Sequence, residues 1–358
     1  LEAVRDADLT ARDADLDLVR GLVTDLPFYG RLSGHTAADG RLGDLAVDVD
    51  WAFRDSLVAT WPESRVRGRG TMDLTGQDVR FVSFAVRDAA VDLGTVRKLV
   101  PAVVLRGVVN GEGGVTGPLH NALFTGTLVH RDGERPASTV TGAMRLDTRG
   151  DTVGVYADVR ADSLSFDGLR GSYPDLPLRG TVAGPIRLNG SAAALDTHAD
   201  LQSAAGAVTV DGVVTLLDTR TGVRSLALAA RNLNLARWVA DGPQSRLSFS
   251  VSGSIAQDSG AAPTGALSAG LAPSLLAGTP FDTGQVAVRF AGGRMFVDSV
   301  RVAQLRLHTT GSGSLGWRRP DAGAMSLTFD ADSLNALDSL VGWLAGPDVA
   351  TTVRGRSL

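Results

Sequence analysis

Large apolar side chains occupy every second position in a series of short segments of this chain. Between residues 45 and 53, Leu45, Val47, Val49, Trp51 and Phe53 alternate with small or charged residues. Successive side chains of a β-strand point to opposite faces, so this spacing places all five on one face. The alternation recurs downstream, and we predict that one face of a sheet is lined by Leu45, Val47, Val49, Trp51, Phe53, Val208, Val210, Leu226, Leu228, Leu247, Phe249, Val251, Val286, Val288, Phe290, Leu305, Leu307, Met325, Leu327 and Phe329.

The residues between these apolar positions are mostly Ser, Thr, Arg and Asp, which makes the other face polar. One apolar and one polar face is typical of antiparallel sheets, whereas the buried strands of parallel sheets are apolar throughout. Asp-Gly and Asn-Gly pairs, which favour the tight turns of β-hairpins, occur at residues 39–40, 110–111, 132–133, 189–190 and 211–212. We therefore expect an all-β chain of antiparallel strands joined largely by hairpins.

A second, longer pattern repeats along the chain. Each copy has a strand that ends in Asp or Asn with Leu or Val, a short apolar set at helical spacing, a proline and a new strand. Such self-similarity indicates stacked units that share one continuous core. Taking Leu16, Val91, Leu164, Leu233 and Leu334 as equivalent, we predict one repeat array over residues 1–358, with a short helix at each hinge and approximate units 1–90, 91–163, 164–232, 233–333 and a partial 334–358.

Together the two patterns predict an elongated, repetitive antiparallel sheet that is curled into a groove, in a taco-like or solenoid-like arrangement. One stretch interrupts the alternation of apolar and polar residues. Residues 254–282 are rich in Gly, Ala, Ser and Pro, and we predict a loop-like excursion there with a helical turn around Leu275 and Leu276. A domain linker is the other interpretation of this stretch, although the same alternation resumes at Val286 and favours one body.

The composition excludes several classes of protein. The chain has 358 residues and no cysteine, which rules out disulfides, thiol catalysis and cysteine metal sites. Lys98 is its only lysine, and a net charge of −4 with both signs scattered does not provide the basic stripe that nucleic acid requires. No run of about 18 apolar residues occurs. We therefore expect no nucleic-acid partner, and we expect that any membrane anchor lies outside this fragment.

Motifs that would carry catalysis are weak. Residues 311–316 match GxGxxG, but the following Trp317 and Pro320 open no helix that would hold a pyrophosphate, so we expect a structural turn or bulge. Asp13, Asp15 and Asp17 resemble the start of a calcium loop, yet Leu18 stands where that loop needs glycine. The five histidines are scattered and form no evident metal cluster. We predict that the protein is not an enzyme and has no cofactor.

The apolar face itself is the remaining candidate. It would be an ordinary core if a second sheet packed against it. It would instead contact an apolar ligand along its length if it were open. Its lining is mainly Val, Leu and Ala, which suits acyl chains better than sugars. The sequence leaves both interpretations open.

Segments such as Leu178–Gly184, and Leu305–Gly316 followed by Met325–Leu334, share the order of features in the hinge repeat. In these segments the chain resembles the TamB and AsmA-like group of bacterial envelope proteins. This resemblance implies a periplasmic, gutter-shaped β-structure anchored in the inner membrane through a segment outside this chain. It further implies movement of phospholipids through contact with their acyl chains, support of outer-membrane protein assembly and secretion, and an outer-membrane barrel protein as a partner. A closed β-solenoid or adhesin-like envelope protein is the alternative expectation.

Overall fold

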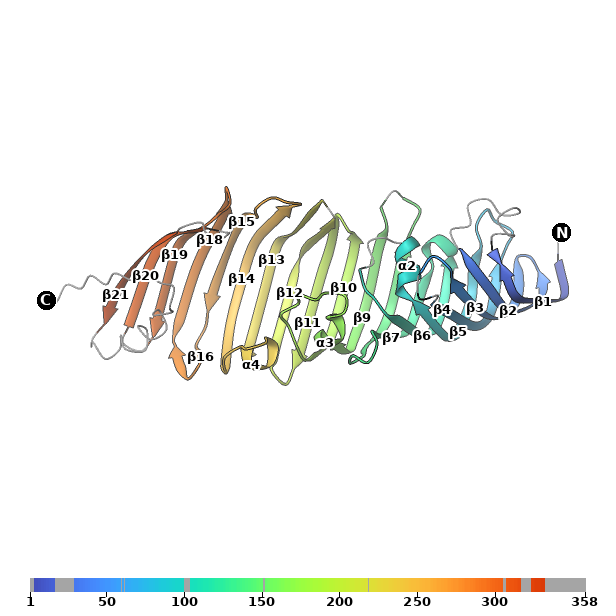
Figure 1. The fold of residues 1–358 in the computed structure, drawn as a ribbon, viewed down its shortest axis with the longest axis horizontal. Helices are drawn as coiled ribbons and strands as arrows, with labels where there is room; N and C mark the ends of the chain where they lie inside the picture. The colour runs from blue at the N-terminus through green and yellow to red at the C-terminus, as the bar shows by residue number, and fades with distance from the viewer. Residues whose placement is uncertain are drawn as a thin grey trace.

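The computed structural model describes residues 3–16, 29–58, 60, 62–99, 104–150, 152–217, 219–304, 307–316 and 323–331. The described residues form one elongated all-β body built on a single antiparallel sheet of 21 strands (Figure 1). The strands are β1 Ala3–Asp15, β2 Gly30–Arg41, β3 Asp44–Asp55, β4 Glu63–Asp73, β5 Arg80–Asp92, β6 Val108–Pro118, β7 Leu123–Arg131, β8 Ser138–Asp147, β9 Gly154–Ser165, β10 Thr181–Ser191, β11 Ala194–Ser203, β12 Gly206–Leu217, β13 Arg220–Leu233, β14 Ser245–Asp258, β15 Thr264–Leu271, β16 Ser274–Leu276, β17 Thr279–Phe281, β18 Thr283–Ala291, β19 Arg294–Gln304, β20 Leu307–Gly316 and β21 Ala324–Ala331.

The strands follow one another across the sheet in chain order. Each pairs antiparallel with the next, except that β15 pairs directly with β18 while the β16–β17 hairpin pairs with the start of β14. Among the described strands, β1 pairs only with β2 and β21 only with β20. The predicted fold class is confirmed: the protein is a curled, elongated, groove-like antiparallel sheet.

Short helices lie at the predicted hinges. α2 (Leu93–Leu99), α3 (Phe166–Leu169) and α4 (Leu235–Trp238) follow β5, β9 and β13. These three strands run in the same direction, and each helix follows the end of its strand. The helices therefore all lie along the same side of the sheet, one after every fourth strand. The predicted hinge that begins at Leu16 and the one around Leu334 lie mostly or wholly outside the described residues.

Local capping explains where α3 and α4 begin. The Ser165 hydroxyl accepts a hydrogen bond from the Gly168 N–H at 3.0 Å, and the Asn234 side chain accepts one from the Ala236 N–H at 3.2 Å. Serine and asparagine oxygens satisfy the first N–H groups of a helix in this way. In α2, Asp92 does the same for the Thr95 N–H at 3.0 Å. The Asp, Ser or Asn in the repeated pattern is therefore the cap of each hinge helix.

Neighbouring hinges pack against each other along this row of strand ends. The rings of Phe166 in α3 and Trp238 in α4 lie 5.7 Å apart between centroids. The segment after α3 reaches the end of α4, where Leu178 forms a bridge with Val239. Phe166 and Trp238 also contact Val182 and Leu233, which lie on the strands beside them. The hinges are thus tied both to each other and to one face of the sheet.

The segment 254–282 is not a loop-like excursion, and the prediction of one is wrong. β14 continues to Asp258, and the rest of the segment forms β15, β16 and β17 with no helical turn at Leu275 and Leu276. Gly, Ala and Ser have low intrinsic strand propensity. Here β15 is stabilised by hydrogen bonding to β14 on one side and to β18 on the other, and tertiary pairing overrides the local preference.

Four of the five predicted turn pairs lie inside strands. The pairs at residues 39–40 and 189–190 lie near the ends of β2 and β10, just before the chain reverses, whereas those at 110–111 and 211–212 lie in β6 and β12, away from a reversal. Gly111 belongs to β6, where an added Cβ would lie 2.8 Å from Leu128 Cδ2 on β7. Gly212 belongs to β12, beside a bulge in its pairing with β13. In both places glycine allows close approach or a bulge within the sheet rather than a reversal of the chain.

Candidate functional site

One face of the sheet carries an unbroken cross-strand row of apolar and small residues. Directly opposite residues of paired strands share a face, so the register can be followed from strand to strand. We define the apolar face by this row, which takes one residue from every strand except β16 and β17: Leu9, Thr36, Val49, Gly68, Val86, Gly113, Gly126, Gly142, Val159, Ile186, Ala199, Val210, Leu228, Val251, Ala269, Val286, Val300, Gly311 and Leu327.

The predicted lining residues lie on this face, apart from Leu305, which falls outside the described residues. Leu45, Val47, Phe290 and Leu307 are buried, and Met325 is 39% exposed. The others are half-buried: Val49, Trp51, Phe53, Val208, Val210, Leu226, Leu228, Leu247, Phe249, Val251, Val286, Val288, Leu327 and Phe329.

Local clusters cover parts of the apolar face. At the strand ends that carry the hinge helices, Phe166 and Trp238 pack with Val182, Ala230 and Leu233. At the opposite ends of the strands near the N-terminus, Leu45 and Val47 pack with Phe84. The described strands form one sheet, and none of them makes a second layer over the middle of this face. The two-sheet sandwich that the sequence left open is therefore not what the described part of the chain forms.

Glycines and aromatic rings in β6–β8 shape the face in a way that the apolar pattern did not predict. Gly113, Gly126 and Gly142 occupy the row on three successive strands. The Phe124 ring lies against the first two, since its Cζ atom would be 3.0 Å from an added Cβ on Gly113 and 2.9 Å from one on Gly126. The sequence signal was present: glycine within a strand marks close approach of another group. The row therefore has no side chains on these three strands, whereas branched side chains occupy it on β12–β14.

The opposite face is polar and carries cross-strand ion pairs. Asp50 accepts hydrogen bonds from Arg65 and from Arg67, the latter at 2.8 Å. Further along, Arg187 lies 3.4 Å from Asp158. Each of these side chains is 40–66% exposed, and exposed ion pairs stabilise a fold by only about 0–1 kcal/mol. Their main consequence is that this face is charged and hydrated.

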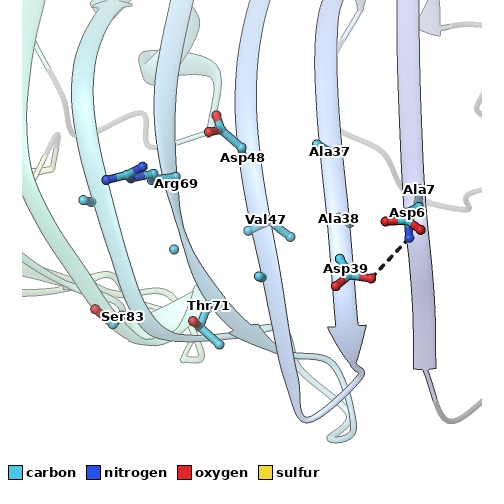
Figure 2. Close-up of a pocket in the computed structure, with 13 residues that line it drawn as sticks. Asp6, Ala7, Ala37, Ala38, Asp39, Val47, Asp48, Arg69, Thr71 and Ser83 are labelled. Carbon is cyan, nitrogen blue, oxygen red and sulfur yellow. Dashed lines mark hydrogen bonds between the residues drawn. The ribbon is translucent and has the colours of Figure 1, made fainter.

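Two hollows lie on this polar face. An open hollow of about 560 Å³ lies across β1–β5. Figure 2 shows Asp48 and Arg69 among its lining residues, beside small side chains such as Ala37. A second hollow of about 370 Å³ is lined by Ser248, Ser250 and Gln285 among others. Within the described ranges, no group of three or more His, Asp or Glu side chains is arranged to hold a metal ion. The apolar row itself runs across the described strands from Leu9 on β1 to Leu327 on β21.

The motifs with candidate chemistry lie in strands. Residues 311–316 belong to β20, and Gly311 lies under the Leu327 side chain, whose Cδ2 is 2.5 Å from where a Cβ would be. The motif was predicted to form a structural turn or bulge; it lies instead in a continuous strand, and the bulge is in the opposite strand β19, between Val297 and Val300. Asp13 and Asp15 belong to β1, where Asp13 pairs with Arg31; Asp17 lies outside the described residues. His35 and His198 pair with Asp8 and Asp211 across strands of the polar face.

Comparisons of the chain with protein-family models, with curated proteins and with solved structures found no match in any of the three. Among the described residues, no helix has the length and hydropathy needed to cross a bilayer. The function is therefore inferred from the sequence and the geometry of the chain itself.

Proposed function

We propose that this protein is a TamB/AsmA-like element of the bacterial cell envelope, whose apolar face contacts phospholipid acyl chains and conducts them between the inner and outer membranes. The observation that carries the proposal is the uninterrupted row from Leu9 to Leu327. No residue of that row is charged, and Thr36 is its only residue with a polar side chain.

The physical basis is one-dimensional movement along an apolar track. Removing one methylene from water is worth about 0.8 kcal/mol, so a lipid tail on the row is held there without a specific pocket. Neighbouring positions are similar in chemistry, so the tail can slide without passing through water. The head group would remain in solvent at the strand ends that carry no hinge helix.

The cellular setting belongs to the same proposal and is supported by the resemblance of the hinge repeat. We place the chain in the periplasm, anchored to the inner membrane through a segment outside these residues. Support of outer-membrane protein assembly and secretion, with an outer-membrane barrel protein as partner, would use the same elongated body as a scaffold.

Site-specific photocrosslinking tests the lipid contact. Leu228 lies on the row, while its chain neighbour Ala227 lies on the polar face and is exposed. Benzoylphenylalanine would be placed at one or the other position and irradiated with vesicles of radiolabelled phosphatidylethanolamine and phosphatidylglycerol. We expect label on the chain substituted at 228 and little on the chain substituted at 227. Equal labelling at the two positions, or none at 228, would show that the apolar face does not carry lipid; none is also what a closed adhesin-like surface predicts.

A further inference from the structure

Three arginines on the polar face between β13 and β19 have no acidic partner among the described residues. Elsewhere on this face an arginine is often paired with a carboxylate of the next strand, as Arg187 is with Asp158. Arg231 of β13, Arg246 of β14 and Arg301 of β19 are all exposed, and none of the three forms an ion pair within the part of the chain that the structure describes. Their positive charge is therefore not neutralised by these strands.

Two of these arginines lie at the ends of one hollow. Polar-face residues of successive strands lie directly opposite each other in the order Ala229, Ser250, Gly270, Gln285 and Arg301. The hollow of about 370 Å³ lies over this series, and its lining includes Arg231, Ser250, Thr283 and Gln285. Arg231 is two residues from Ala229 in β13, so it lies at one end of the hollow, while Arg301 follows Gln285 at the other.

Arg246 lies near Arg231. Arg231 belongs to a bulge of β13 opposite Ser248 of β14, and the N–H of Asn232 in the same bulge donates to the Ser248 hydroxyl at 3.1 Å. Arg246 is two residues from Ser248 in β14, which puts it on the same face at about 7 Å along the strand. Like charges on neighbouring strands are destabilising. An anion held between these two guanidinium groups would remove their repulsion.

The lining of the hollow offers hydrogen-bonding groups and no carboxylate. None of the lining residues is acidic, and Asp282, which is next to Thr283 in sequence, is not among them. Ser250, Thr283 and Gln285 are exposed, and their hydroxyl and amide groups both donate and accept hydrogen bonds. Gly270, between Ser250 and Gln285, has no side chain to cover them. This set of groups suits a ligand that carries hydroxyl groups next to an anionic group.

We propose that this hollow is a binding site for a phosphate ester of a polyol, such as a glycerol phosphate group. The phosphate would lie between Arg231 and Arg246, because guanidinium groups bind phosphate oxygens through paired hydrogen bonds. The hydroxyl groups of the ligand would contact Ser250 and Gln285. The site lies on the face opposite the apolar row, so it does not depend on whether that row carries lipid.

Titration calorimetry with sn-glycerol 3-phosphate tests the site. Arg231→Gln should weaken binding by about tenfold or more, because a hydrogen bond between two charged groups is lost. Arg224→Gln is the matched control, since Arg224 is exposed and belongs to the other bulge of β13, towards the opposite end of the strand. This control should bind like the unaltered chain. Both variants replace exposed side chains, so their circular dichroism spectra should be unchanged.

The same phosphate chemistry occurs in soluble esters and in lipid head groups, and a second measurement separates these sources. Each chain would be sedimented with vesicles of phosphatidylglycerol and phosphatidylcholine. Vesicle binding that Arg231→Gln weakens and Arg224→Gln does not would assign the site to a lipid head group. Binding of glycerol 3-phosphate alone, with the same dependence on Arg231, would assign it to a soluble ester.

Cysteine protection shows where the bound probe lies. The chain has no cysteine, so a single introduced cysteine reports on its own position. The bound probe should slow the reaction of Ser250→Cys with N-ethylmaleimide severalfold. It should not slow that of Ala266→Cys, which is exposed on the same face of β15, nearer the other end of the strand. The proposal is overturned if neither probe binds, if Arg231→Gln and Arg224→Gln weaken binding equally, or if both cysteines are protected alike.

Discussion

The Nζ atom of Lys98, the only lysine of the chain, lies 2.8 Å from Oδ1 of Asp55. Lys98 belongs to α2 and Asp55 ends β3, so the contact ties the first described hinge helix to a strand two positions away in the sheet. The Asp55 side chain is only 3% exposed and also accepts a hydrogen bond from the Leu57 N–H at 2.8 Å. A carboxylate in this position is stable only because these donors replace water.

Acid should weaken this hinge. Burial raises the pKa of Asp55, but the hydrogen bonds from Lys98 and the Leu57 N–H outweigh it and hold the pKa below its usual value of 3.8. The unfolded chain then takes up this proton at a higher pH than the folded chain does. The stabilising contribution is complete above pH 3.8 and declines as the pH falls below it. Urea unfolding at a series of pH values should show this loss, and Asp55→Asn should remove it.

Lys98→Met provides the complementary variant. Burial is the largest single influence on the pKa of Asp55, and Lys98 donates the strongest of the hydrogen bonds that oppose it, so the pKa should rise when the ammonium group is removed. The sign of the pH dependence contributed by this site should then reverse, with the variant gaining stability relative to the unaltered chain as the pH falls. An unchanged pH profile in both variants would mean that the ion pair does not contribute to stability.

Removal of the Trp238 side chain should open the contact between neighbouring hinges. Trp238 is 8% exposed and packs on Phe166. Loss of a buried aromatic side chain costs about 3–5 kcal/mol, so Trp238→Ala should lower the free energy of unfolding by that order. Hydrogen exchange should show faster exchange around α3 and α4, with β2–β5 little changed. Trp238→Phe keeps a ring at the contact and serves as the control; if both variants lose the same stability, the ring contact is not the cause.

Glycine within β7 should be intolerant of even one added methyl group. A Cβ on Gly126 would lie 2.1 Å from the Glu112 carbonyl oxygen and 2.6 Å from Gly113 Cα. Gly126→Ala should therefore destabilise the sheet by about 1–3 kcal/mol, as overpacking does. Gly114→Ala is the matched control, because a Cβ there meets nothing within 4 Å. Thermal melts of the two variants should differ clearly, and equal melting temperatures would contradict the close packing of β6 on β7.

A charge on the apolar row should block lipid contact without unfolding the sheet. Leu228 is half-buried on a face with no second sheet over it among the described strands, so the carboxylate of Leu228→Asp can reach water. We expect the circular dichroism spectrum to be retained and crosslinking to acyl chains at position 286, measured with benzoylphenylalanine in place of Val286, to fall severalfold. Ala227→Asp, on the polar face, should leave the crosslinking unchanged. If Leu228→Asp unfolds the chain, Leu228 is a core residue and the proposed conduit loses its support.

The sequence by itself determined which side chains share a face and where the hinges fall. Alternation such as that from Leu45 to Phe53 is a local property of one strand, because each residue sets its own direction relative to its neighbours. The caps Ser165 and Asn234 act within three residues of their helices. Both features could therefore be predicted before any tertiary contact was known.

The tertiary structure decided what covers each surface. The strands of residues 254–282 depend on pairing with β14 and β18, and Lys98 meets Asp55 across 43 residues of sequence. Whether a second sheet covers the apolar face is likewise set by chain segments far apart in sequence. Periodicity reports the direction of a side chain, whereas its burial depends on which distant strand the fold brings against it.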